Sequence, residues 1–89
     1  MAVYVDGLHY PGHGRRWCHL VADSGPELDA MAARLGLRPE WKEDAGTPRE
    51  HFDLPASHRT LALEHGAVPV TRRELARLLR RKRELACQS

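Results

Sequence analysis

The stretch WCHLVADSGPE, residues 17–27, decides how this chain folds. Its first six residues are apolar except for one histidine, and apolar residues on both faces predict a central strand over residues 17–22. Ser24 and Glu27 then form a Ser-x-x-Glu capping box, in which the serine side chain bonds to the glutamate amide and the glutamate reaches back to the cap amide. Pro26 suits a first helical turn, because no N–H is needed there. The stretch therefore predicts a buried strand that runs directly into a helix.

Two more strands and two more helices are predicted around this junction. The strands are expected at AVYV, residues 2–5, and AVPV, residues 67–70, where Pro69 indicates an edge strand. The helices are expected at residues 55–65 and, behind a second capping box, at residues 72–84. The order β-β-α-α-β-α predicts an α/β (α+β) fold, a small mixed sheet of about three short strands packed by three helices.

The chain is expected to form a single domain over residues 1–89, with irregular segments between its elements. LHYPGHGRR, residues 8–16, predicts a mobile loop, because glycine and proline interrupt regular structure. Residues 37–54 show no clear period and predict a long connection, with a short extended piece at HFDL, residues 51–54. Residues 85–89 are expected to form a disordered tail.

The composition is typical of a soluble globular domain. The 89 residues are 42% hydrophobic and 29% charged, and no apolar run approaches the ~20 residues that span a bilayer. Residues 1–7 lack the pattern of a signal peptide, and Cys18 and Cys87 show no pairing pattern, so we expect a cytoplasmic protein without membrane contact or disulfide. Because so short a chain buries only roughly 60–65% of its unfolded surface, a homodimer would add useful buried area.

Charge is distributed unevenly along the chain. Residues 1–70 hold seven Lys/Arg and ten Asp/Glu, a net charge of −3, whereas residues 71–89 hold seven Lys/Arg and two Glu, a net charge of +5. A basic helix of this kind can bind nucleic-acid phosphates, at most without sequence specificity, or an acidic partner. The alternative is a solvated helix that carries cations because its C-terminal end favours them.

The first candidate for chemistry is His19, a polar residue in the apolar strand. Its neighbour on the same strand face, Asp23, would lie about 13 Å away in a straight strand, at ~3.3 Å per residue. The two side chains therefore cannot share one proton or one metal ion. His19 is either a buried imidazole with a satisfied hydrogen bond or one part of a site whose other parts come from elsewhere.

The better partners lie in the segment HFD, residues 51–53. In an extended chain His51 and Asp53 point the same way, about 6–7 Å apart at their Cα atoms. This spacing suits two ligands of one ion, or a histidine oriented by a carboxylate. The alternative is that Asp53 caps the following helix while His51 bonds locally. Histidine with aspartate favours Zn²⁺ or Mn²⁺ over Mg²⁺.

Two further positions carry weaker signals. Asp6 ends the first strand, where a carboxylate serves as a metal ligand or general base, but it also precedes Gly7 as turn-forming residues do, and the turn is favoured. Arg15 and Arg16 end the glycine-rich loop, which can wrap a phosphate through amides and guanidinium groups. That loop lacks the Lys-Ser/Thr of a P-loop, so a solvated loop is the favoured interpretation.

The segments WCHLVADS, ELDAMAARLGL, HFDLP and GAVPVTRRELARLL together resemble a family of small bacterial and phage proteins known as domain of unknown function 4031. The resemblance covers almost the whole chain, in order and with similar spacings. It implies that the polar residues of HLVAD and HFD belong to the family pattern, as do Arg59 and Arg73. Phe52 departs from that pattern, in which tyrosine is usual, and the arginine-rich tail after Leu79 is particular to this chain. The resemblance implies no activity.

Two hypotheses from different classes follow. In the first, which the sequence favours because so short a chain seldom builds a deep pocket, the protein is a binding or interaction module. In the second it is a divalent-metal-dependent hydrolase, phosphoesterase-like or nuclease-like. The catalytic residues of that enzyme would be His19, His51 and Asp53. Its metal ligands would be Asp6, His19, His51 and Asp53. Its binding residues would be Arg15, Arg16, Arg59 and Arg73.

Overall fold

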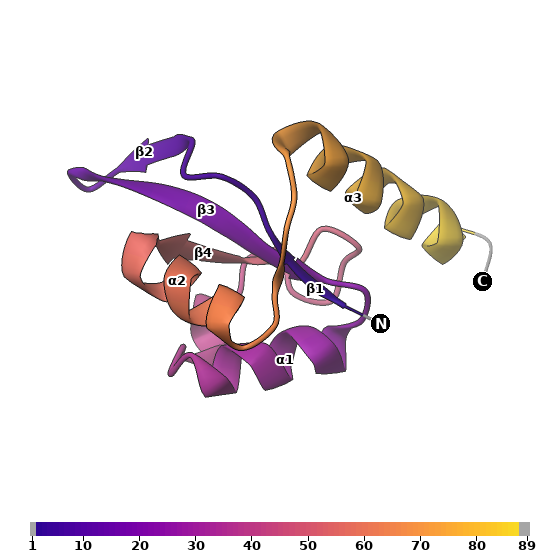
Figure 1. Ribbon diagram of the computed structural model, residues 1–89. Coiled ribbons are helices and arrows are strands. Elements are labelled where there is room, and N and C mark those ends of the chain that lie inside the picture. The colour runs from indigo at the N-terminus through magenta and orange to yellow at the C-terminus, as the bar shows by residue number, and fades with distance from the viewer. Residues whose placement is uncertain (1, 88–89) are drawn as a thin grey trace.

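The computed structural model describes residues 2–87, which form a five-stranded mixed sheet with helices on both sides (Figure 1). The strands are β1 (Val3–Val5), β2 (Tyr10–Gly12), β3 (Arg15–Ala22), β4 (Phe52–Pro55) and β5 (Val68–Pro69). The helices are α1 (Gly25–Arg34), the short 3₁₀ helix η1 (Pro39–Trp41), α2 (Ala56–Glu64) and α3 (Arg72–Cys87). The predicted fold class is confirmed, with two more strands than expected.

The long strand β3 is the centre of the sheet, as the apolar stretch predicts. It pairs antiparallel with β1, β2 and β4, while β5 joins the far edge of β1 in parallel. Pro69 therefore does lie on an edge strand, where its missing N–H leaves no interior hydrogen bond unmade. The extended piece predicted at residues 51–54 is also confirmed, because β4 begins at Phe52.

Capping residues place the starts of α1 and α3. The Glu27 amide donates to Ser24 Oγ over 3.3 Å, and Ser24 Oγ donates to the Glu27 carboxylate over 2.7 Å, instead of the predicted return bond to the cap amide. At α3 the capping box is complete, because the Glu74 amide donates to Thr71 Oγ1 and the Thr71 amide donates to the Glu74 carboxylate. Both helices begin where the sequence predicts.

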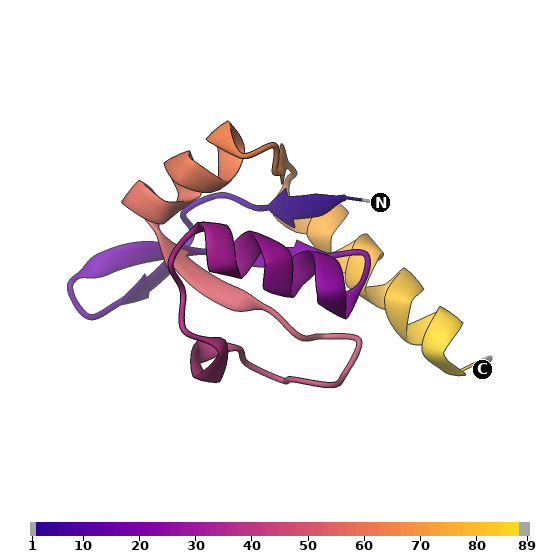
Figure 2. The same cartoon turned by 90° about the horizontal axis from the view of Figure 1, so that it is seen from below.

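The core lies between the sheet and the pair α1 and α2, which both cover the same face (Figure 2). Leu20, Leu28 and Leu54 are completely buried there, as is Cys18. Burial raises the pKa of the Cys18 thiol to about 12, so this cysteine is an inert core residue. Both cysteines are free thiols, and within residues 2–87 no helix is long and apolar enough to cross a membrane.

Two expectations about irregular segments are wrong, those for residues 8–16 and for the tail, whereas the long connection predicted before β4 is present. Residues 8–16 are not a mobile loop, because β2 and β3 form a hairpin there whose turn, His13-Gly14, has positive φ at both residues. The connection 37–54 contains η1 and is closed by a bridge between Glu43 and His51. The tail predicted as disordered belongs to α3 as far as Cys87, and residues 88–89 lie outside the described range.

Candidate metal centre

The pairing of β3 with β4 brings the two predicted halves of a site together. His19 lies directly opposite Asp53 in the antiparallel register, so both side chains stand on the same face of the sheet. His51 precedes Asp53 by two residues, and strand alternation points it to that face as well. The bridge between Glu43 and His51, with both of its backbone hydrogen bonds formed, holds His51 in extended backbone. The sheet thus gathers three polar residues separated by up to 34 positions.

The polar atoms of these residues lie close enough to share one ion. One ligand atom from each of His19, His51 and Asp53 lies within 4.8 Å of the others. Asp53 Oδ1 is 3.8 Å from His19 Nε2 and 3.6 Å from His51 Nε2. Ligands of a tetrahedral zinc ion, with bonds of about 2.0–2.1 Å, are separated by about 3.4 Å. Side-chain shifts of a few tenths of an ångström up to about 1 Å would therefore complete a three-ligand site.

Asp6 lies behind His19 and does not form the turn that was the favoured interpretation. Its carboxylate is completely buried and accepts hydrogen bonds from the His19 amide at 2.7 Å, from His19 Nδ1 at 3.1 Å and from the Tyr10 hydroxyl at 3.1 Å. Arg59, from α2, donates to the Asp6 carbonyl at 2.8 Å. Asp6 is therefore outside the group of three mutually close residues, and its position is that of a residue that orients His19.

The hydrogen bonds at the two Nδ1 atoms determine where the lone pairs of the rings point. His51 Nδ1 lies 2.8 Å from the Arg49 carbonyl, which only accepts, so this nitrogen carries the proton. His19 Nδ1 faces the Asp6 carboxylate and is the donor of that pair in the same way. In each neutral ring the lone pair is consequently on Nε2, the atom next to Asp53. Metal-binding histidines almost always show this arrangement, with the second nitrogen donating to a carboxylate or carbonyl.

Electrostatics reinforce the Asp6–His19 pair. Burial opposes ionisation of Asp6, but the hydrogen bonds from the side chain and amide of His19 outweigh it and hold the Asp6 pKa below its usual value. The hydrogen bond to Asp6 raises the pKa of His19, against the opposing effect of burial, and the nearby charges of Asp53 and Glu43 act in the same direction. In the absence of an ion, His19 therefore binds a proton more tightly than an ordinary histidine.

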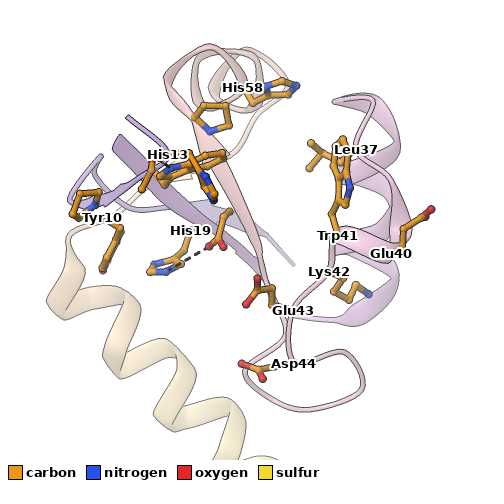
Figure 3. Close-up of a pocket in the computed structure, with 15 residues that line it drawn as sticks. Tyr10, His13, His19, Leu37, Glu40, Trp41, Lys42, Glu43, Asp44 and His58 are labelled. Carbon is orange, nitrogen blue, oxygen red and sulfur yellow. Dashed lines mark hydrogen bonds and ion pairs between the residues drawn. The ribbon is translucent and has the colours of Figure 1, made fainter. Parts of the chain in front are cut away.

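A groove of about 1110 Å³ opens beside the three residues. In Figure 3, Tyr10, His13 and His19 line one side of it. Leu37 and Trp41 face them from the segment after α1, and the dashed line at His19 marks its contact with Asp53. Asp53 is 40% exposed, so an ion held by it would keep coordination positions open to the groove. Open positions distinguish catalytic zinc sites from structural ones, whose four ligands all come from protein.

The family model for "Protein of unknown function (DUF4031)" matches residues 3–82. The chain belongs to this family. The match spans Asp6, His19, His51 and Asp53 and ends inside α3, and it confirms the resemblance seen in the sequence. No curated protein and no solved structure matches the chain significantly. The family description carries no activity, so the geometry of this DUF4031 chain is the ground for any proposal.

The remaining predicted residues are not members of the close group formed by His19, His51 and Asp53. Asp23 is at the opposite end of β3, where it accepts from the Ala2 amide at 2.7 Å and the Tyr4 hydroxyl at 3.0 Å, so it is no part of this site. Asp53 does not cap α2, whose N-cap is Pro55 without a side-chain hydrogen bond. Arg15 and Arg16 are exposed on the hairpin, and Arg73 is exposed on α3.

Sequence inspection missed Tyr10, Trp41 and Glu43. The Tyr10 ring lies against the His19 ring at an interplanar angle of 53°, with centroids 4.1 Å apart, and Glu43 lines the groove and forms the β-bridge with His51. A sequence signal for Tyr10 did exist, because the aromatic residues Tyr10 and Trp17 stand symmetrically on either side of a His-Gly turn, and they do pair across the hairpin. Trp41 and Glu43 lie in a segment without periodicity, and no sequence signal singles them out.

Proposed function

We propose that this chain is a divalent-metal-dependent hydrolase whose ion, Zn²⁺ or Mn²⁺, is held by His19, His51 and Asp53. The observation that carries the proposal is the orientation of the two imidazoles. Both Nδ1 atoms donate to acceptors, the Asp6 carboxylate and the Arg49 carbonyl. Both Nε2 lone pairs are therefore available to bind an ion next to the Asp53 carboxylate. A purely structural polar cluster has no need to direct two lone pairs at one point.

The residue chemistry favours hydrolysis over a closed structural site. Two imidazoles with one carboxylate suit Zn²⁺ or Mn²⁺, and such an ion supplies Lewis-acid chemistry together with a bound water of lowered pKa. Three protein ligands leave room for that water and a substrate oxygen on the groove side. Glu43 lines the groove without being one of the ligands, so its carboxylate is available as general base for the water.

Metal binding is tested with protein purified without a histidine tag. We expect elemental analysis and calorimetric titration to find one Zn²⁺ or Mn²⁺ per chain. His51→Ala and Asp53→Asn should each lower the affinity by at least about 100-fold, because loss of a ligand costs more than the 10–100-fold typical of outer-shell changes. His58→Ala is the matched control: His58 lines the same groove outside the ligand set and should leave metal affinity unchanged.

Hydrolysis is tested with a chromogenic phosphodiester. Turnover should require the metal, and Glu43→Gln should retain the metal while losing most of the turnover. A protein that is metal-free as purified, shows no binding heat with either ion, and only loses stability in the His51 and Asp53 variants would contradict the proposal. That result would leave the binding-module interpretation, which needs no ion.

A further inference from the structure

We infer that the substrate of this site is a single-stranded nucleic acid, held by the basic helix α3 and by the tryptophan-lined groove on either side of the proposed metal site. The inference rests on the proposed function, because the phosphodiester is the bond presented to the ion. Its supporting observation is a juxtaposition: the first turn of α3, Tyr10 and His19 lie next to one another (Figure 3).

Tyr10 is the residue that joins the two surfaces. The centroid of its ring lies 4.1 Å from that of the His19 ring and 5.7 Å from the guanidinium carbon of Arg72, in the first turn of α3. Tyr10 also lines the groove. Only the Tyr10 ring therefore separates the first turn of α3 from the proposed ligand His19. A polyanion bound along α3 would reach the proposed metal site.

The exposed surface of α3 has the chemistry of a phosphate-binding surface. Arg73, Arg77 and Arg80 follow one another at spacings of four and three residues, which places them in a row on one helix face, and all three are exposed. That row lies opposite Leu75, the one residue of α3 that is buried. Arginine dominates this helix over lysine, and its guanidinium forms paired hydrogen bonds with phosphate oxygens. An acidic polypeptide offers carboxylates instead, and the competition with polyglutamate described below tests that alternative.

The groove beside the proposed metal site has aromatic side chains that can hold unpaired bases. Trp41 is 54% exposed, and Trp17 lines the same groove, so two indoles are available to bases that enter it. Arg38 lies over the Trp41 ring at 5.8 Å, and Arg15 over the Trp17 ring at 5.9 Å, each adding a cation beside an aromatic face. Aromatic stacking with neighbouring positive charge is how proteins hold single strands without reading their sequence. Bases paired inside a duplex cannot stack in this way.

The test measures binding of a fluorescein-labelled 15-nucleotide single strand by anisotropy, in excess EDTA and over a series of salt concentrations. Binding in EDTA does not require the ion, so its failure is separate from a failure of the proposed metal site. R77S/R80S is expected to weaken binding at least tenfold at low salt and to reduce the slope of log K against log salt by about 1.4, at about 0.7 for each phosphate that is no longer neutralised. In the charge-matched comparison, R77S alone should weaken binding measurably, whereas R34S, which removes the same single charge from an exposed position outside α3, should change the affinity less than twofold.

Two further measurements decide what kind of polyanion binds. W41A should weaken binding of the single strand several-fold and leave a duplex of the same length unaffected, and the single strand should quench tryptophan fluorescence. Polyglutamate at equal charge concentration should fail to displace the oligonucleotide. The inference is overturned if R34S and R77S lose affinity equally, or if a duplex binds as tightly as the single strand and W41A changes nothing. It is also overturned if polyglutamate competes as well as the nucleic acid, which would identify an acidic protein as the partner.

Discussion

Helices α1 and α3 both begin with a capping box shortly after a strand, yet only α1 is part of the core. α1 buries Leu28, Met31 and Ala32, whereas α3 buries Leu75 alone among its described residues. A cap determines where a helix begins, but the width of its apolar stripe determines how much of it packs. The consequence for function is a division of labour. The residues of the proposed metal site lie on or next to strands that pack into the core. The arginines lie on a helix that contributes one buried residue to the packing.

The largest effect is expected where the site and the core share one strand. Phe52 is 1% exposed and lies between His51 and Asp53 on β4. Phe52→Ala should cost about 3–5 kcal/mol, a large part of the stability of so small a protein. Urea denaturation followed by circular dichroism measures the loss. A variant that unfolds at an unchanged urea concentration would show that β4 is not part of the cooperative core.

A smaller but more specific effect is expected at Asp6. Asp6→Asn keeps the shape and removes the charge that His19 faces, at a cost of about 1.5–3 kcal/mol for a hydrogen bond to a charged group. The raised pKa of His19 means that the pair adds stability below the unfolded histidine pKa of about 6.5, and that this contribution is lost as the pH rises through the folded pKa. Denaturation in EDTA should therefore show stability falling with rising pH in this window.

At acid pH, Asp6 gives the free energy of unfolding the opposite dependence on pH. Because its folded pKa is lowered, it adds stability above the ordinary aspartate pKa of about 3.9, and this contribution is lost as the pH falls through the folded value. The asparagine side chain of the D6N variant cannot titrate, so the variant should lose the slopes at both ends of the profile. An unchanged pH profile in D6N would mean that another residue holds the His19 proton.

The sequence predicts the features of the fold that depend on local signals and misses those that depend on tertiary pairing. Caps and apolar spacing are local, so the starts of α1 and α3 and the strand β3 follow from the residues themselves. The hairpin was missed because Pro11 and Gly12 disfavour a strand, and β2 exists through its pairing with β3 and a hydrogen bond from Trp17 Nε1 to the Gly12 carbonyl. Tertiary pairing here overrides local propensity.

The site shows the same contrast. That His51 and Asp53 share a face follows from strand alternation, but their position opposite His19 depends on the register of β3 with β4, which no local pattern encodes. Asp6 was expected in a turn because Gly7 follows it. In the folded chain the amide and ring of His19 surround its carboxylate, and these long-range hydrogen bonds outweigh turn preference.

Removal of the N-cap side chain of α1 or of α3 is expected to cost about 1 kcal/mol of helix stability in each case. Ser24→Ala should lower the global free energy of unfolding by that amount, because α1 unfolds together with the core. Thr71→Ala should instead loosen α3 locally, so its amides should exchange faster with solvent while the urea midpoint barely moves. Equal shifts of the urea midpoint in both variants would show that α3 folds cooperatively with the sheet.

The smallest effect is expected at the far end of α3. Leu85 is 59% exposed, so Leu85→Ala should change the free energy of unfolding by less than about 0.5 kcal/mol, since most of this side chain already lies in solvent. The measurement should be repeated at two protein concentrations tenfold apart, because a dimer is stabilised by concentration and a monomer is not. A cost above about 1 kcal/mol that grows with concentration would mean that a second copy covers Leu85 in solution. The apolar end of α3 would then belong to a homodimer interface, and its arginine row would have to bind nucleic acid from within that dimer.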